Sequence, residues 1–206
     1  MSEVSKNISE LLSGTYGKAI VVGGTVYVIK APSIKVIMRA TQYLSKVDLP
    51  ENGTVRELMK VAPANLENIV KGLSFLVVGD VPNYQKRAES LERQMLSGSK
   101  EELLQAYFVA FELITGREFF RSLPVSDGAG KSDSKTQVVG GNTIVGSITL
   151  FMENLNLSYR EVYEDLPYLL LLLMSADKPR AVYEDKEKTE VKKMSGKDLM
   201  RQKRGA

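Results

Sequence analysis

The chain contains no cysteine, no histidine and no tryptophan. Without cysteine it has no disulfide, no thiolate nucleophile and no zinc–thiolate site. Without histidine it lacks the commonest metal ligand and the usual general base near neutral pH, which excludes Ser-His-Asp chemistry. Carboxylate and lysine chemistry remain open, but no arrangement of residues points to either. We therefore predict a protein that is not an enzyme, with no catalytic residues, no cofactor and no metal.

A long apolar segment is also missing. The first residues are polar and show no apolar signal segment. The longest apolar run, 169–174, lies in an expected helix of about ten residues, half of the ~20 that a bilayer crossing needs. We expect a cytoplasmic protein without a membrane partner.

The composition that is present is typical of a soluble globular protein. The 206 residues are 43% hydrophobic and 26% charged, with a net charge of +3. From Asp177 onward there are ten Lys/Arg and six Asp/Glu, which is +4, so the remainder is +3 − 4 = −1. A near-neutral body lacks the basic stripe of a nucleic-acid-binding domain, so nucleic acid is not the expected partner.

Hydrophobic periodicity predicts a mainly α protein with a small N-terminal β-hairpin. Residues 18–22 and 25–30 alternate as strands around Gly23-Gly24, a strong two-residue hairpin signal. A lone hairpin is marginal, so it must lie on helices or pair with another chain. Helices are expected at 6–13, 33–47, 54–61, from Pro63 to Val78, 83–96, 99–121, 144–155 and 167–176.

Four segments organise the chain. Residues 1–122 form the hairpin and a multi-helix globular domain. Residues 123–142, rich in Gly, Ser, Asp and Lys, form a flexible internal loop. Residues 143–180 form a C-terminal helical unit packed on the first domain. Residues 181–206 are a charged tail, which we expect to be mobile when free.

Short motifs indicate helix starts more than chemistry. Capping boxes are predicted at Thr54–Glu57, Ser99–Glu102 and Ser158–Glu161. Residues 128–132 resemble the end of a phosphate-binding P-loop, but the position of its first glycine is Val125, which favours a flexible linker. Further minor predictions are solvated acid pairs at 101–102 and 184–185, and Asn142 as the N-cap of the helix at 144.

The segment Thr143–Arg180 carries the most information. Its first helix places Ile144, Ile148 and Phe151 at helical spacing, and its last is apolar on every side. A helix that is apolar all round must be covered all round. It is therefore either a buried core helix or a docking face for a partner, and the two are compatible if one side is buried and the other docked.

The layout resembles that of the tail assembly chaperones of long-tailed bacteriophages and related prophages. The resemblance is carried by the glycine-turn hairpin at 21–30, the Pro-Ser helix start, and residues 157–168 leading into a leucine-rich helix, Asp-Lys-Pro-Arg180 and a charged tail. It implies a small helical cytosolic protein that coats the tape measure protein and helps recruit tail tube subunits.

We hypothesise that the last helix and one face of the 99–121 helix build an apolar groove for a helical client. The structural alternative is a component of a virion or contractile injection machine, in which the hairpin adds to a neighbour's sheet. A second alternative is a nucleic-acid-linked regulator that uses the basic tail, and a further copy of the chain is another candidate partner. The partner-binding residues of this hypothesis are Phe108, Phe111, Leu169, Leu170, Leu172, Leu173 and Met174.

Overall fold

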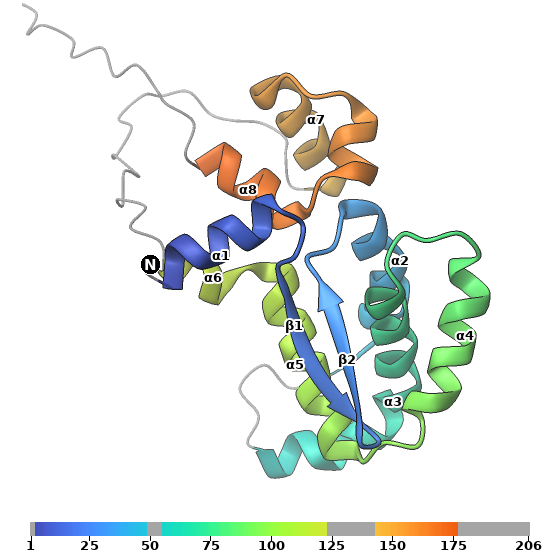
Figure 1. Cartoon of the computed structure of the whole chain (residues 1–206). Helices are drawn as coiled ribbons and strands as arrows, with labels where there is room; N and C mark the ends of the chain where they lie inside the picture. The colour runs from blue at the N-terminus through green and yellow to red at the C-terminus, as the bar shows by residue number, and fades with distance from the viewer. Residues whose placement is uncertain (1–2, 49–54, 123–142, 177–206) are drawn as a thin grey trace, which may run out of the picture.

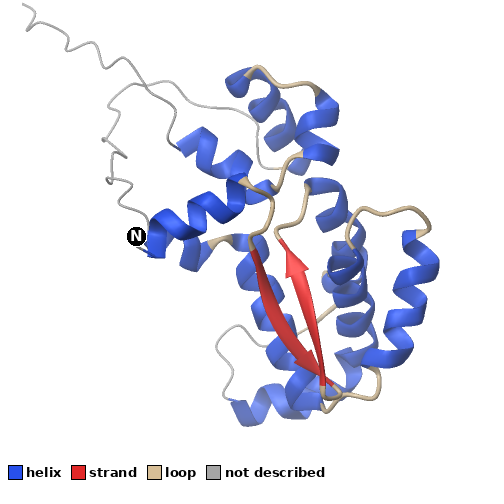
Figure 2. Ribbon diagram, in the orientation of Figure 1, coloured by secondary structure: helices blue, strands red, loops and turns tan. Residues whose placement is uncertain are grey.

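The computed structural model describes residues 3–48, 55–122 and 143–176. Within these ranges the fold is mainly α with one two-stranded antiparallel hairpin near the N-terminus, as predicted (Figures 1 and 2). The elements in chain order are α1 (Glu3–Leu12), β1 (Gly17–Val22), β2 (Thr25–Lys30), α2 (Ile34–Leu44), α3 (Val55–Val78), α4 (Tyr84–Met95), α5 (Lys100–Thr115), α6 (Arg117–Ser122), α7 (Ile144–Leu155), η1 (Glu161–Asp165) and α8 (Tyr168–Ala176).

The hairpin packs on the helices of the body, which comprises the described residues up to Ser122. Gly23 and Gly24 both have positive φ (58° and 72°), which glycine adopts without steric strain, and β1 and β2 pair from Val22–Thr25 to Gly17–Lys30. The inward side chains Ile20, Val22 and Ile29 are buried. The hairpin contacts α5 through β1 and α3 through β2 (Figure 1). The hairpin is therefore stabilised by helices, one of the two arrangements that the sequence allowed.

A single helix, α3, replaces the two short helices expected at 54–61 and from Pro63, so that prediction was wrong. Pro63 lies inside α3 on its exposed side. Proline leaves one carbonyl of the preceding turn without its N–H partner, and on an exposed side that carbonyl can bond water. The buried face that follows, which includes Ile69 and Leu73, packs the rest of α3 into the body.

The helix expected at 99–121 is divided in two at Gly116, which corrects the prediction. α5 begins with the predicted capping box: the Ser99 hydroxyl accepts from the Glu102 N–H (3.2 Å) and the Glu102 carboxylate accepts from the Ser99 N–H (2.8 Å). It ends at Gly116, whose φ of 66° is left-handed, and α6 follows at once. A left-handed glycine is a common helix stop, and here it overrides the helical pattern of the sequence.

The C-terminal unit consists of α7, η1 and α8. α7 has the predicted bounds, but its N-cap is Thr143, which accepts a hydrogen bond from the Gly146 N–H at 3.3 Å, so the prediction of Asn142 was wrong. The predicted box at Ser158 is confirmed, because Glu161 N–H donates to the Ser158 hydroxyl and Ser158 N–H donates to the Glu161 carboxylate (3.3 and 2.8 Å). The turn that it begins, η1, is a π-helix.

Two apolar clusters form the core, and α8 contributes to both. The larger lies between the hairpin and helices α2, α3, α5 and α6, and it includes Leu169 and Leu170. The smaller joins Leu171 to Ile34 of α2 and to residues of α7 and η1. Because α8 fills both clusters, it fixes the C-terminal unit on the body.

Several predictions lie outside the described residues. These are the internal loop at 123–142 with its glycine-rich motif, the tail at 181–206, the acid pair at 184–185, and the Thr54 end of the first capping box. In the ranges that are described, no helix is long and apolar enough to cross a membrane.

Candidate protein-docking surfaces

The exposed aromatic strip is on α5. Phe108 and Phe111, both in the predicted partner-binding set, are 41% and 42% exposed. A different face of the helix turns Leu103, Ala110 and Leu113 inward. The capping box at the start of α5 and Gly116 at its end set the two ends of the helix.

Tyr107 and Arg117 complete the strip. The ring centroid of Tyr107 lies 5.5 Å from that of Phe108 and 6.4 Å from that of Phe111. The guanidinium of Arg117 lies over the Phe111 ring, 5.8 Å from its centroid, at the distance of a cation–π contact. Burial raises the pKa of the half-buried Tyr107 hydroxyl, so this side chain is neutral near pH 7. The strip is therefore apolar with a cation at one end.

The leucine-rich helix α8 is mostly core. Leu169 is 1% exposed and Leu171 is fully buried, and Leu170 is also buried, so Leu169 and Leu170 of the predicted groove face inward. Leu172 and Leu173 are partly buried against the larger cluster, and Met174 is 38% exposed. The structure therefore places the predicted partner-binding residues in three environments rather than in one groove.

The chain segments before α2 and α8 hold these two helices together. Ser33 and Pro167 form an antiparallel bridge, and Tyr168 N–H donates to the Pro32 carbonyl at 2.9 Å. Hydrogen bonds from Ser158 lower the pKa of Glu161, so this capping carboxylate is ionised near neutral pH and fixes the start of η1. The start of α8 is positioned by backbone contacts on one side and by η1 on the other.

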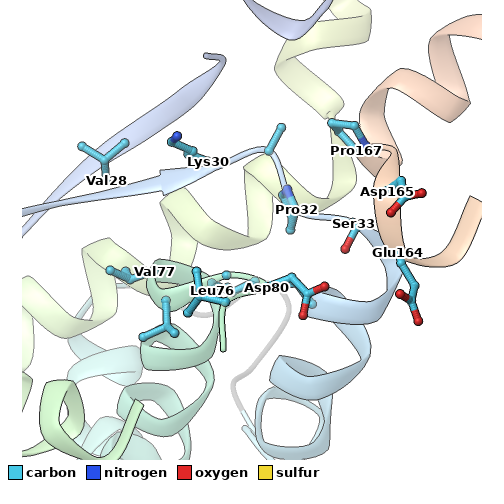
Figure 3. A pocket seen from close by; sticks show the side chains of 15 residues that line it. Val28, Lys30, Pro32, Ser33, Leu76, Val77, Asp80, Glu164, Asp165 and Pro167 are labelled. Atoms are coloured by element: carbon cyan, nitrogen blue, oxygen red, sulfur yellow. The ribbon is translucent and has the colours of Figure 1, made fainter. Parts of the chain in front are cut away.

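A cavity of about 360 Å³ lies beside the end of β2, between β2, the C-terminal end of α3 and η1 (Figure 3). Its walls are apolar along β2 and α3 and polar near η1. Its lining includes Val28, Lys30, Ser33, Val36, Leu76, Val77, Asp80, Glu164 and Asp165.

A network of ion pairs closes the polar end of the cavity. Asp80 accepts from Lys35 at 3.2 Å and from Arg39 at 2.9 Å, and Lys35 also reaches Glu164 of η1 at 3.4 Å. The Arg39 guanidinium stacks 3.6 Å from the centroid of the Tyr84 ring. Burial alone would raise the pKa of Asp80, but the bonds from Lys35 and Arg39 outweigh it and lower that pKa. The network links α2, the end of α3 and η1.

The polar groups of this region do not form a recognisable catalytic arrangement. The buried Ser33 hydroxyl has no hydrogen-bond partner among the described residues, and it lies near Asp80 and Glu164 in Figure 3. A serine whose hydroxyl makes no hydrogen bond to a base is a weak nucleophile. Glu102 of the predicted solvated pair is used structurally, since its carboxylate also accepts from the Gly23 N–H at 3.1 Å. Among described residues, no group of three acids could hold a metal ion.

Sequence reasoning missed the outer face of the hairpin. Val21, Val26 and Val28 point away from the helices and are 51%, 63% and 52% exposed. Antiparallel sheets with one solvated face usually alternate apolar and polar residues. In this hairpin the outward positions, which include Val21, Val26 and Val28, are apolar like the inward ones. This absence of apolar–polar alternation is visible in the sequence, and it could have indicated an apolar outer face.

No family model matches the chain, and neither the curated proteins nor the solved structures contain a significant match to it.

Proposed function

We propose that this protein is a non-enzymatic tail assembly chaperone of a long-tailed bacteriophage. In this role it binds the tape measure protein in the host-cell cytoplasm and helps recruit tail tube subunits. The observation that carries the proposal is the aromatic strip of α5, in which Phe108 and Phe111 are exposed beside Tyr107. Large exposed aromatics are typical of protein-binding surfaces, where each buries 150–250 Å² at low entropic cost.

The strip fits a helical client. Phe108 and Phe111 are three residues apart and Tyr107 and Phe111 are four apart, so all three lie on one face of α5. A client helix that presents apolar residues at i, i+3 and i+4 can pack along such a face. Arg117, which stands over Phe111, offers a cation to an acidic residue of the client at one end. A long helical tape measure protein would repeat this contact along its length.

The role of α8 in this proposal differs from the sequence hypothesis. Leu169 and Leu170 are core residues, and they support the fold from which α5 presents its strip. Only the outer side of α8, with Met174 exposed, remains available to a client. The proposed client-binding set is therefore centred on Phe108 and Phe111.

Co-expression with a helical segment of a bacteriophage tape measure protein tests the proposal. We expect Phe108→Asp with Phe111→Asp to reduce co-purification of the segment at least about tenfold, because charge would replace the central apolar contacts. Val145→Asp is the matched control, since Val145 of α7 is 67% exposed and its variant should bind normally. Thermal unfolding of each variant checks that the fold is retained.

Two results would count against the proposal. If the unaltered chain does not bind the tape measure segment, the chaperone function is wrong. If the chain binds but the double variant binds equally well, the function stands and the α5 strip is not the site.

A structural component of a virion or contractile injection machine is the second candidate. The observation that favours it is the apolar outer face of the hairpin, which a neighbouring subunit would cover in an assembled particle. Mass spectrometry of purified particles separates the two functions. A chaperone is absent from the finished particle, whereas a structural component is present in fixed copy number.

A further inference from the structure

The outer edge of β2 carries backbone groups that no described residue pairs. In an antiparallel pair, residues alternate between hydrogen-bonded and non-hydrogen-bonded positions. Ala31 N–H donates to the Tyr16 carbonyl at 2.9 Å, which sets that alternation for the whole ladder. Val26, Val28 and Lys30 therefore occupy non-bonded positions, and their N–H and C=O groups point away from β1. No backbone hydrogen bond from another described element meets this edge.

The cavity lies against this same edge. Its wall includes Val28 and Lys30 but not Tyr27 or Ile29, whose backbone groups point toward β1. The opposite wall is formed by apolar side chains, Leu76 and Val77 among them (Figure 3). A strand added beside β2 would place every second side chain into the cavity and the others beside Val26 and Val28 on the outer face.

The charges around the edge nearly cancel. Asp80, Glu164 and Asp165 line the cavity, and the nearby cations are Lys30 in its wall and Lys35 behind it. Arg39 binds Asp80, and Arg160 lies 3.6 Å from Asp165. Such a balanced site favours an uncharged occupant over an anion or a strongly basic segment. Residues 177–206 of this chain carry ten basic and six acidic side chains, so they are poorly matched to it.

A second copy of the chain is also poorly matched. Six residues per strand at about 3.3 Å each, in two strands about 4.8 Å apart, make a face of roughly 200 Å². A stable interface needs about 800 Å² on each partner. Edge-to-edge pairing of two hairpins would bring α3 and α4 of both copies together, because these helices extend beyond the β2 side of the hairpin (Figure 1). The space suits a single extended strand.

We propose that the outer edge of β2 binds a strand from another polypeptide, an extended uncharged segment with branched apolar side chains at alternate positions. The backbone groups of Val26, Val28 and Lys30 supply the hydrogen bonds, and the cavity selects the inward side chains. This surface is separate from the aromatic strip of α5, so it does not depend on the chaperone assignment.

A display library of peptides about nine residues long, with Val, Ile or Leu at alternate positions and Thr, Ser or Asn between them, provides the probe. Selected peptides should bind the full chain and slow hydrogen exchange at the amides of Val26 and Val28. Val28→Pro removes an outward N–H without breaking a bond to β1, and should weaken binding at least about tenfold. Ala19→Pro is the matched control, because Ala19 faces Val28 and points its N–H outward from β1, and it should bind normally.

Val77→Phe is a second variant that leaves β2 intact but fills the cavity, and it should also weaken binding. The proposal is overturned if no peptide binds better than a scrambled peptide of the same composition, or if Val28→Pro and Val77→Phe both bind normally. It is also overturned if the Val26 and Val28 amides are already protected in the protein alone. Protection at every concentration would mean that the chain covers its own edge, and protection that grows with concentration would mean that a second copy does.

Discussion

Gly116 is the residue on which the path of the chain after α5 depends. Its φ of 66° ends α5, and its N–H donates to the Glu112 carbonyl at 2.8 Å. The position also has no room for a side chain, because a Cβ there would overlap the Leu169 side chain of α8. One glycine thus sets both the separation of α5 from α6 and the close approach of α8.

Gly116→Ala should destabilise the protein more than a left-handed backbone alone explains. Alanine at positive φ costs about 1–2 kcal/mol, and overpacking against Leu169 adds about 1–3 kcal/mol. Gly14→Ala is the matched control, since Gly14 has a φ of 70° but open space around it. Urea denaturation of both variants measures the difference. Equal losses would show that Leu169 moves aside at little cost.

At the scale of elements, α8 shows why an apolar run alone does not define a docking face. Its leucines enter both clusters, with Leu169 in the larger and Leu171 in the smaller. Met174 is on the exposed side. A helix with no polar residue among its leucines has no periodicity, so sequence could not assign its inward side.

Leu171→Ala should therefore lower the free energy of unfolding by about 2–5 kcal/mol, the usual cost of emptying a buried leucine site. Met174→Ala should change it by no more than about 0.5 kcal/mol, because the side chain is partly in solvent. Denaturant midpoints give both changes in the free energy of unfolding, provided that the slope of this free energy against denaturant concentration stays constant. A small effect of Leu171→Ala would mean that α8 is not part of the folded core.

Local signals explain most of what could be predicted. The hairpin follows from Gly23-Gly24, and the boxes at Ser99 and Ser158 follow from contacts only three residues long. The failures have tertiary causes. Pro63 continues a helix because its face of α3 is exposed, and α5 ends at Gly116, where Leu169 of α8 comes close. The cavity beside β2 is formed by segments distant in sequence, so no local pattern could reveal it.

At the scale of the whole molecule, the ion network ties the C-terminal unit to the body. Lys35 connects Asp80, just after α3, with Glu164 of η1. The bridge between Ser33 and Pro167 runs beside it. These side chains are partly shielded, with 23% of Lys35 and 17% of Arg39 exposed, so the pairs are less screened than ordinary surface pairs.

The network predicts a defined pH dependence of stability. The pKa of Asp80 in the folded protein is below its ordinary value of 3.8. The ionised Asp80 therefore contributes to the free energy of unfolding above pH 3.8, and this contribution declines as the pH falls through the folded-state pKa. The hydrogen bond to Asp80 raises the pKa of Lys35 above 10.5, so the contribution of Lys35 is present below that value and declines as the pH rises through the folded pKa.

Asp80→Asn should lower the free energy of unfolding by about 1 kcal/mol at neutral pH. The difference in this free energy between the variant and the unaltered protein should become smaller below about pH 3.8. Urea unfolding between pH 7 and about pH 2 measures that gap. Parallel curves over the whole acidic range would show that Asp80 does not contribute through its charge.

The pairing of Ser33 with Pro167 has a consequence during translation. The two residues of the bridge leave the ribosome at widely separated times, on the order of ten seconds apart at about 5–20 residues per second. Until Val162 and Leu171 emerge, nascent Ile34 lacks the residues that will enclose it. Premature termination before α7 would therefore release a polypeptide with an uncovered apolar surface around Ile34. Such a polypeptide would be a substrate for cellular proteases.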